Sequence, residues 1–258
     1  MKDPLIDVNV YLGQWPTRRL AGDENAQALG ARLAARGVTE AWVGSFDGLF
    51  HKDLAAVNAR LAESCREVEG VRLVPFGAIN PIDSNWEAEL DRCAGEHGMP
   101  GIRLHPNYHG YALDHAAFAK LLRAAAERGL IVSLAPVMED ARMMHPRLRV
   151  PAVDLGPLAA LVKQTAGLRL LLLNALRRSV PEKLVTAGEV YFEIGMLEGL
   201  GGLERSLQKM PLEKVLFGSY SPAFYFESAQ LKLRESRLGH HQRRAIMSEN
   251  ARRLLPGR

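Results

Sequence analysis

Residues 5–13 read LIDVNVYLG, and this stretch decides how the rest of the chain is interpreted. Its apolar residues predict a β-strand, and Asn9 and Tyr11 place polar side chains near the carboxyl end of that strand. A second apolar run, Thr39–Ser45, follows a segment with the spacing of an amphipathic helix, Glu24–Arg36. The chain therefore opens as a strand, a helix and a second strand, which is typical of a parallel sheet.

The alternation of apolar run and amphipathic helix continues to the end of the chain. Strands are predicted over Leu5–Leu12, Thr39–Ser45, Val71–Asn80, Gly101–His105, Leu130–Pro136, Leu168–Asn174, Glu189–Met196 and Lys214–Ser219. Helices are predicted over Glu24–Arg36 and Lys52–Glu67, from near Ser84, from Asp114 to Arg128, over Leu158–Thr165, Pro181–Ala187 and Leu203–Lys209, after Pro222, and over His240–Leu255. Eight strand–helix units predict one domain, residues 1–258, of the α/β class, folded as a single (β/α)8 barrel. A doubly wound open sheet is the alternative, but no GxGxxG motif follows the first strand.

The composition is that of a globular protein and argues against several classes of partner. The 33 Lys and Arg residues are scattered, so we expect no nucleic-acid binding, and the net charge of +4 suits a small anionic ligand. No apolar run approaches the roughly 18 residues of a membrane span. The first residues, MKDPLIDV, do not read as a signal peptide. We expect a cytoplasmic protein in which Cys65 and Cys93 are buried free thiols.

In a (β/α)8 barrel the functional site lies at the carboxyl ends of the strands. The residues that we single out there are Asn9, Tyr11, Arg103, His105, Asn174, Glu193 and Tyr220. Arg103 and His105 are two residues apart, so within a strand their side chains share a face. An Arg–His pair suits the binding of a carboxylate or phosphate together with proton transfer. Glu193 is the best isolated candidate for a carboxylate base.

Four segments carry a resemblance to a known family: IDVNVYLG (residues 6–13), GIRLHPNYHGYALDHAAFAKLLRAAAERGLIVSL (101–134), VLFGSYSP (215–222) and SENARRLL (248–255). In that order they resemble the first strand, the strand 4–helix 4–strand 5 unit, the strand-8 GSDYP signature and the closing helix of the amidohydrolase superfamily. The branch that they resemble is the amidohydrolase-related, metal-dependent-hydrolase-like one, whose first strand usually reads ID-x-H-x-H-x-G. The resemblance covers the whole chain and also implies a barrel.

The same resemblance implies a divalent metal centre, usually Zn²⁺, whose ligands are replaced in this sequence. The two histidines of strand 1 fall on Asn9 and Tyr11, and the histidines of strands 5 and 6 fall on Ala135 and Asn174. The aspartate of strand 8 falls on Tyr220. Amide and phenol oxygens are poor Zn²⁺ ligands compared with imidazole and carboxylate, and an alanine side chain supplies none. We therefore predict no family-type metal and no other cofactor.

The replacing side chains can still form hydrogen bonds, which favours a pocket of changed chemistry over a collapsed one; a buried structural network is the alternative. In the pocket interpretation the catalytic residues are His105 and Glu193. The substrate-binding residues are Asn9, Tyr11, Arg103, Asn174, Tyr220 and His145. The alternatives are a structural histidine at position 105 and burial of Glu193 beside an arginine.

The loop after Leu130–Pro136 is long enough to be functional. If it forms a helical turn, Glu139 and Arg142 are neighbours, and His145 could line the pocket. His109 is interpreted as exposed or as supporting the site from behind. This loop and residues 224–226 (FYF) are candidate contacts in a homodimer.

Three functions follow from these expectations. The first is a metal-independent hydrolase or lyase, of the lactonase or decarboxylase type, that acts on a small carboxylated molecule; the branch includes enzymes of both types. The second is a non-catalytic homologue that binds a small ligand or a protein partner, which the loss of the usual ligands supports. The third is a hydrolase with a relocated metal site, built from His105, His109, His145 or Glu139. The sequence alone does not decide whether the protein is an enzyme.

Overall fold

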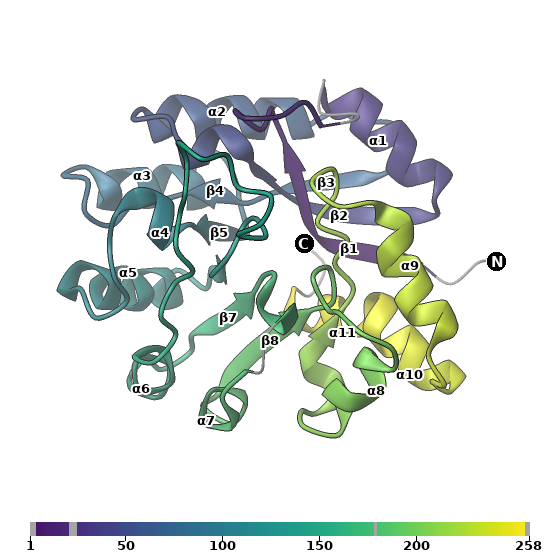
Figure 1. Cartoon of the computed structure of the whole chain (residues 1–258). Coiled ribbons are helices and arrows are strands. Elements are labelled where there is room, and N and C mark those ends of the chain that lie inside the picture. Colours follow the sequence, from purple (N-terminus) through teal and green to yellow (C-terminus); the bar gives the residue numbers. More distant parts are fainter. Residues whose placement is uncertain (1–3, 21–24, 178–179, 256–258) are drawn as a thin grey trace.

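The computed structural model describes residues 4–20, 25–177 and 180–255, and these residues form an α/β barrel (Figure 1). Its strands are β1 (Leu5–Leu12), β2 (Val38–Ser45), β3 (Arg72–Pro75), β4 (Gly77–Ala78), β5 (Gly101–Leu104), β6 (Ile131–Leu134), β7 (Arg169–Leu172), β8 (Glu189–Glu193) and β9 (Val215–Leu216). All strands that pair do so in parallel. The predicted (β/α)8 fold is confirmed.

The helices lie around the outside of the strands, as Figure 1 shows. They are α1 (Ala26–Ala35), α2 (Leu54–Cys65), α3 (Trp86–Ala94), α4 (Pro106–His109), α5 (Ala116–Glu127), α6 (Leu158–Gln164), α7 (Glu182–Val185), α8 (Gly202–Leu207), α9 (Phe226–Glu235), α10 (His240–Arg244) and α11 (Asn250–Leu254). Among the described residues the longest helices, α2 and α5, have 12 residues each, and no described helix is long and apolar enough to cross a membrane.

The strands form two hydrogen-bonded sheets, β1-β2-β3 and β4-β5-β6-β7-β8-β9, and the backbone joins the sheets at both edges. At one edge Phe76 N–H, between β3 and β4, donates to Val43 O on β2 (2.8 Å). At the other edge Val8 N–H donates to Phe217 O (3.0 Å) and Tyr220 N–H donates to Asn9 O (2.8 Å). These contacts bring β1 beside the end of β9, so that first and last strands are neighbours.

Every residue of β1 is buried, and its side chains divide between two apolar clusters. The cluster between strands and helices contains Leu5, Val10 and Leu12, whereas the cluster inside the barrel contains Ile6, Val8 and Tyr11. The pairing register between β1 and β2 is irregular from Asp7 to Val10. Such irregularities change the direction in which side chains point. They account for Val10 facing away from the interior although Val8, two residues earlier, faces it.

Two predicted elements in the first half differ from those observed. The predicted strand Val71–Asn80 is divided at Phe76 into β3 and β4, because that residue pairs with β2 and not with β5. The segment after Gly101–His105, for which no helix is predicted, contains the one-turn helix α4, with Pro106 at its first position. Proline suits that position because its missing N–H would have no partner there.

Three predicted helix boundaries are also corrected or lie outside the described residues. Ser84 does not cap α3; the residue at that position is Asn85, whose side chain forms no capping hydrogen bond. The last helix is interrupted by a π-helical turn, Ala245–Glu249, between α10 and α11. Glu24, the predicted start of the first helix, lies outside the described residues. The observed α1 is capped by Asn25, whose side chain accepts a hydrogen bond from Ala28 N–H.

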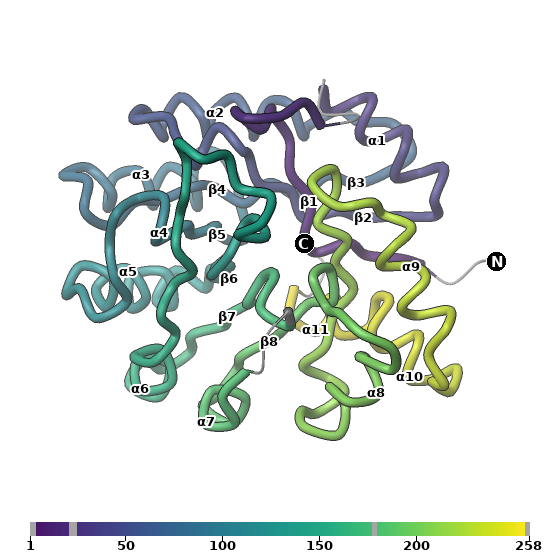
Figure 2. Tube along the Cα trace, viewed as in Figure 1, coloured from purple at the N-terminus to yellow at the C-terminus, as the bar shows by residue number. Residues whose placement is uncertain are grey.

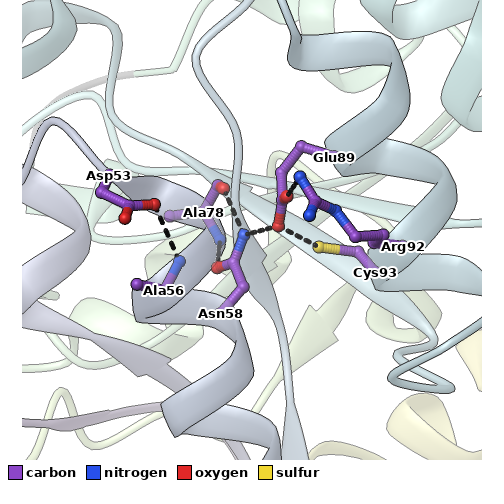
Figure 3. A network of polar contacts seen from close by, with 7 residues as sticks. All are labelled: Asp53, Ala56, Asn58, Ala78, Glu89, Arg92 and Cys93. Atoms are coloured by element: carbon purple, nitrogen blue, oxygen red, sulfur yellow. Dashed lines mark hydrogen bonds and ion pairs between the residues drawn. The ribbon is translucent and has the colours of Figure 1, made fainter.

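The two-residue strand β4 is held by a buried side chain of α2 (Figure 3). Asn58 donates from Nδ2 to Ala78 O (2.9 Å) and accepts from Ala78 N–H at Oδ1 (2.7 Å). The same Nδ2 donates to Glu89 Oε1 of α3 (2.8 Å), while Arg92 pairs with Glu89 Oε2 (2.9 Å). Asn58 therefore replaces the ladder hydrogen bonds that so short a strand lacks, and it links α2, β4 and α3.

Replacing Asn58 with Ala is expected to lower the free energy of unfolding by about 3 kcal/mol. The change leaves the buried N–H and C=O of Ala78 without partners, and each costs roughly 1–3 kcal/mol before relaxation; Glu89 Oε1 keeps only the weak donor Cys93 Sγ (3.8 Å). Denaturant unfolding measures the change. Asn85→Ala, at an exposed position without a side-chain capping bond, is the matched control. A loss below about 1 kcal/mol for Asn58→Ala would contradict the assignment.

Candidate functional site

Seven of the predicted site residues meet inside the carboxyl end of the barrel. They are Asn9, Tyr11, Arg103, His105, Asn174, Glu193 and Tyr220, and each has an exposed fraction of 0–1%. The eighth predicted residue, His145, does not join them: it is exposed, and its Nδ1 accepts a hydrogen bond from Arg147 N–H (3.2 Å). Its role in substrate binding stays a prediction, without a contact to this cluster.

Glu193 is the centre of the cluster. Its Oε1 accepts from Asn174 N–H (2.5 Å) and from Asn9 Nδ2 (3.2 Å), and its Oε2 accepts from Gly195 N–H (2.5 Å). Asn9 Nδ2 also donates to Asn174 Oδ1 (2.9 Å), while Asn9 Oδ1 is buried without a partner. The Asn9 side chain and the Asn174 backbone N–H thus bind one carboxyl group, and the two asparagine side chains bind each other.

Two tyrosines close the same end of the barrel. Tyr11 Oη lies 3.0 Å from His105 Nε2, within hydrogen-bonding distance, and its ring stacks on Phe46 at 4.6 Å between centroids. Tyr220 Oη donates to Met138 O (2.6 Å), and its ring meets that of Tyr11 edge-on at 5.7 Å. The phenol rings and Met138 therefore fill the space between the polar cluster and solvent.

Two residues of the cluster have a positive φ, a backbone conformation that residues with a side chain rarely adopt. Asn174 has φ 59° and Tyr220 has φ 58°, and no other non-glycine residue in the described part of the chain has a positive φ. Asparagine tolerates the left-handed region, whereas a bulky residue there costs on the order of 1–2 kcal/mol. Strain of this kind is concentrated at functional sites. Both positions are ones at which the family resemblance places a metal ligand.

Burial governs the charges of the two predicted catalytic residues. Desolvation raises the pKa of Glu193 above its usual value, although the N–H groups of Asn174 and Gly195 oppose the shift. Desolvation also lowers the pKa of His105 well below its usual value, with smaller contributions from His109 and Arg103. Glu193 is thereby poised to hold a proton, and His105 is a neutral imidazole whose Nδ1 has no partner.

Arg103 lies deeper in the barrel than the strand-end position that we predicted for it. Its Nη1 donates to Val10 O (2.8 Å), and its Nη2 donates to Trp42 O (3.1 Å) and Val8 O (3.4 Å). A Cβ at position 44 would lie 2.7 Å from Arg103 Cδ, so Gly44 provides the room for this side chain. The guanidinium is bonded to the backbone of β1 and β2, and substrate binding by Arg103 stays a prediction.

Two further residues belong to this site, and sequence reasoning did not single them out. Asp7 Oδ1 accepts from Asn9 N–H (3.1 Å) and Ser219 N–H (2.9 Å) and so links β1 to the chain after β9. Lys232 Nζ donates to Ile194 O (3.0 Å) and Gly195 O (2.5 Å), directly behind Glu193. An acid within an apolar strand was a usable signal for Asp7. Lys232 lies among the charged residues of α9, and nothing in the sequence distinguishes it.

Replacing Asp7 with Asn is expected to flatten the pH dependence of stability. Burial raises the pKa of Asp7 from 3.8 to about 7, so between these values the folded carboxyl holds a proton that the unfolded one has released. The contribution of Asp7 to stability is therefore complete below about pH 4 and is lost as the pH rises to about 7, by on the order of 4 kcal/mol. Asn keeps an oxygen for both N–H donors and has no such titration. Denaturant unfolding between pH 4 and 7 measures both profiles, and parallel profiles would contradict this.

The residues of the loop after β6 form pairs that differ from those expected. Arg142 pairs with Asp140 (Nη2–Oδ2 2.6 Å), and Glu139 pairs with Arg18 (Oε1–Nε 3.3 Å), so the expected Glu139–Arg142 pairing is wrong. His109, on α4, is partly buried and lies 2.8 Å from Gly48 O through Nε2. Its ring centroid is 6.0 Å from that of His105. His109 therefore supports the cluster from behind.

A cavity of about 590 Å³ opens beside the cluster, between the loop after β6 and the segment that follows β7. Its wall includes Asn174, and its polar lining otherwise comprises Glu139, Asp154 and Lys183. Figure 2 traces this long loop between β6 and α6. Asn174 Nδ2 donates to Val137 O (3.0 Å) and so fixes the first part of the loop. We call this space the Asn174 cavity; its size is that of a small-molecule site.

The donors at the family's metal positions do not fit a metal ion. Asn9 directs its NH₂ group, not its oxygen, to the carboxyl of Glu193, and Tyr220 uses its hydroxyl on Met138 O. Ala135 contributes no ligand. Among the described residues there is no group of three or more His, Cys, Asp or Glu that could hold a metal. Of the set considered for a relocated site, His105, His109, His145 and Glu139, the rings of His105 and His109 lie 6.0 Å apart, whereas His145 is exposed.

The chain belongs to the amidohydrolase family: a family model of that description matches residues 19–257. The family predicted from the four sequence segments is confirmed. The match begins after β1, the strand in which the resemblance places the family's histidines at Asn9 and Tyr11. No curated protein matches the sequence.

Solved structures of similar fold include several decarboxylases. The 2,6-dihydroxybenzoate decarboxylase from Rhizobium has a TM-score of 0.75 at 14% identity, with 98% of each chain covered. The 5-carboxyvanillate decarboxylase from Sphingomonas paucimobilis has a TM-score of 0.75 at 12% identity, covering 98% of this chain and 99% of its own. A 5-carboxyvanillate decarboxylase from Novosphingobium aromaticivorans, a mutant solved with bound manganese and a nitrobenzoic acid, has a TM-score of 0.73 at 15% identity, covering 98% and 97%. At these identities the likeness shows the fold.

Proposed function

We propose that this chain is a metal-independent lyase of the decarboxylase type that acts on a small carboxylated molecule. The observation that carries the proposal is the position of Asn174, which forms part of the wall of the Asn174 cavity and also donates from its backbone N–H to Glu193. One residue thus separates a cavity of ligand size from a buried carboxyl group that is poised to hold a proton. The decarboxylases among proteins of similar fold support the same reaction type.

The proposed reaction needs a proton donor and a place for the carboxylate. Protonated Glu193 donates its proton to the ring carbon that carries the carboxylate, and a π electron pair of the ring forms the new C–H bond. The bond to the carboxylate then breaks, CO₂ leaves, and the electron pair of that bond restores the ring. Water returns a proton to Glu193, and the hydroxide that remains combines with CO₂ to give bicarbonate. Lys183 in the cavity lining supplies a cation for the substrate carboxylate. The side chains at the positions where the resemblance places metal ligands include amides and phenols. The hydrogen-bond donors around Glu193 therefore supply the electrostatic stabilisation of the transition state that a metal would otherwise give.

The proposal is tested with purified protein dialysed against a chelator. The candidate substrates are 2,6-dihydroxybenzoate, 5-carboxyvanillate and related hydroxybenzoates, and the measurement is CO₂ release together with the metal content of the protein. Turnover that persists without stoichiometric metal is the expected result. Turnover that requires added Mn²⁺ or Zn²⁺ would contradict metal independence.

A second function is favoured by one specific observation, the burial of the whole cluster. Asn9, His105, Glu193 and Tyr220 are 0–1% exposed, which is the geometry of a structural network beneath a non-catalytic ligand site. In that case the Asn174 cavity binds a small molecule without converting it. Thermal stabilisation by a member of the same panel, with no CO₂ release from any of them, would support this second function.

A further inference from the structure

A second cavity lies at the opposite end of the barrel from the cluster of Glu193. Its volume is about 490 Å³, and it is lined by Leu5, Arg36, Gly37, Phe217, Gln230, Leu233, Arg234, Arg243 and Met247. Leu5 begins β1 and Gly37 immediately precedes β2, so the cavity faces the amino ends of these strands. Helices α9 and α10 provide the other side, and Figure 1 shows α9 beside the start of β1, between α1 and α10. We call it the arginine cavity.

The charge of the arginine cavity is one-sided. All three charged residues of its lining are arginines, and no described acidic residue lines it. Arg36 is neutralised, because its Nη2 and Nε contact Glu227 Oε1 (2.6 and 2.8 Å). Arg234 and Arg243 pair with no carboxylate among the described residues. Two uncompensated guanidinium groups therefore face one space.

Arg243 has hydrogen-bonding capacity that the described residues do not use. Its Nη2 donates to Ser236 O (2.9 Å), which fixes the side chain, but its Nε is buried without a partner. A buried N–H without an acceptor costs roughly 1–3 kcal/mol, and more when the group is charged. An oxyanion in the cavity would compensate the charge of this guanidinium. A guanidinium presents its N–H groups in a fork that matches carboxylate and phosphate oxygens.

Apart from Gln230, the remainder of the lining is apolar, and one of its residues belongs to an unusual turn. Leu5, Phe217, Leu233 and Met247 provide a hydrophobic surface next to the arginines. Met247 lies in the π-helical turn Ala245–Glu249, which directly follows Arg243 and Arg244 of α10. π-Helical turns are rare and occur frequently at functional sites. The cavity thus combines a cationic side with an apolar side.

We propose that the arginine cavity binds a small molecule that carries a carboxylate or phosphate on an apolar body, with Arg234 and Arg243 as the oxyanion ligands. The apolar part packs against Phe217, Leu233 and Met247. The site is separate from the Asn174 cavity and does not depend on the function proposed for Glu193. Its ligand would contact both α9, which carries Lys232, and the chain segment that leads to Tyr220.

The test is isothermal titration of the full chain with three probes that share a phenyl body. Phenylacetate and phenyl phosphate carry the two kinds of oxyanion, and 2-phenylethanol is the uncharged control. Both oxyanions are expected to bind at least tenfold more tightly than the alcohol, and the tighter of the two identifies the preferred oxyanion. Arg234→Gln and Arg243→Gln are each expected to weaken oxyanion binding about tenfold, the effect of one charge-assisted hydrogen bond.

Arg244→Gln is the matched control for Arg243→Gln, because it removes the same charge from the same helix, α10. Arg244 pairs with Glu249 and does not line the cavity. The Arg244→Gln variant is expected to bind the probes as the parent chain does. Arg234 is exposed and without a partner among the described residues, so Arg234→Gln stays folded and keeps the test decisive. The proposal is overturned if neither oxyanion binds, if 2-phenylethanol binds as tightly, or if Arg234→Gln and Arg244→Gln have equal effects. Binding in the Asn174 cavity alone would leave all three variants unchanged.

Discussion

Replacing Arg103 with Leu is expected to lower the free energy of unfolding by about 4 kcal/mol, the largest effect on stability that we predict. The guanidinium, 1% exposed, reaches from β5 to three carbonyl oxygens, those of Val8, Val10 and Trp42. Leu leaves these oxygens without their charged donor and leaves space beneath the ring of Tyr11, which lies 4.6 Å from the guanidinium carbon. Burying the charge is itself costly, so the loss is smaller than the sum of three bonds.

Denaturant unfolding of Arg103→Leu and Arg103→Lys measures this effect. A lysine ammonium cannot span three oxygens that a planar fork reaches, so Lys is expected to recover only part of the loss. Arg123→Leu, at an exposed position on α5, is the matched control and should change stability by less than about 0.5 kcal/mol. If Arg103→Leu also changed the free energy of unfolding by less than about 0.5 kcal/mol, the hydrogen bonds from Arg103 to the strand carbonyls would not contribute to stability.

Replacing Glu193 with Gln is expected to reduce the proposed decarboxylation by about a thousandfold. The amide has nearly the same shape but cannot donate the proton, and general acid catalysis contributes roughly 10²–10⁴ in rate. Glu193 accepts N–H groups at both oxygens, so the NH₂ of Gln also faces donors and destabilises the fold. Turnover is therefore compared at a temperature at which both proteins are shown to be folded by circular dichroism.

The control for this variant lies on the same strand. Glu189→Gln removes a carboxylate at the exposed start of β8 and is expected to leave turnover unchanged. The rate of the parent chain should also fall as the pH rises, because the raised pKa of Glu193 sets the pH above which its proton is lost. A Glu193→Gln protein with the parent's rate and pH profile would remove Glu193 from the mechanism while leaving metal independence to the chelator experiment.

The barrel was predictable because its signal is repeated along the whole chain. Each apolar run is followed by a helix with one buried stripe, and errors in single boundaries do not alter that order. The division of Val71–Asn80 at Phe76 was not predictable, because it depends on the hydrogen bond of Phe76 N–H with Val43 O, a partner on another strand. The π-helical turn within His240–Leu255 was not predictable either, because its residues have the same spacing of apolar side chains as an α-helix.

The members of the candidate site were predictable, and their contacts were not. Period-two alternation correctly places Arg103 and His105 on the same side of β5, facing the interior. The depth of Arg103 follows from the missing side chain at Gly44 on β2, which only the assembled sheet reveals. His145 was chosen because a histidine in a long loop suits a pocket, yet the loop carries it away from the cluster.

The hydrogen bonds that Asn174 and Tyr220 form with the loop after β6 have a kinetic consequence. Asn174 Nδ2 donates a hydrogen bond to Val137 O, and Tyr220 Oη donates one to Met138 O. Two consecutive residues of the loop are therefore bonded to the two residues that have a positive φ. If a ligand reaches Glu193 only when both bonds are open, its observed association rate levels off at the opening rate as ligand concentration rises.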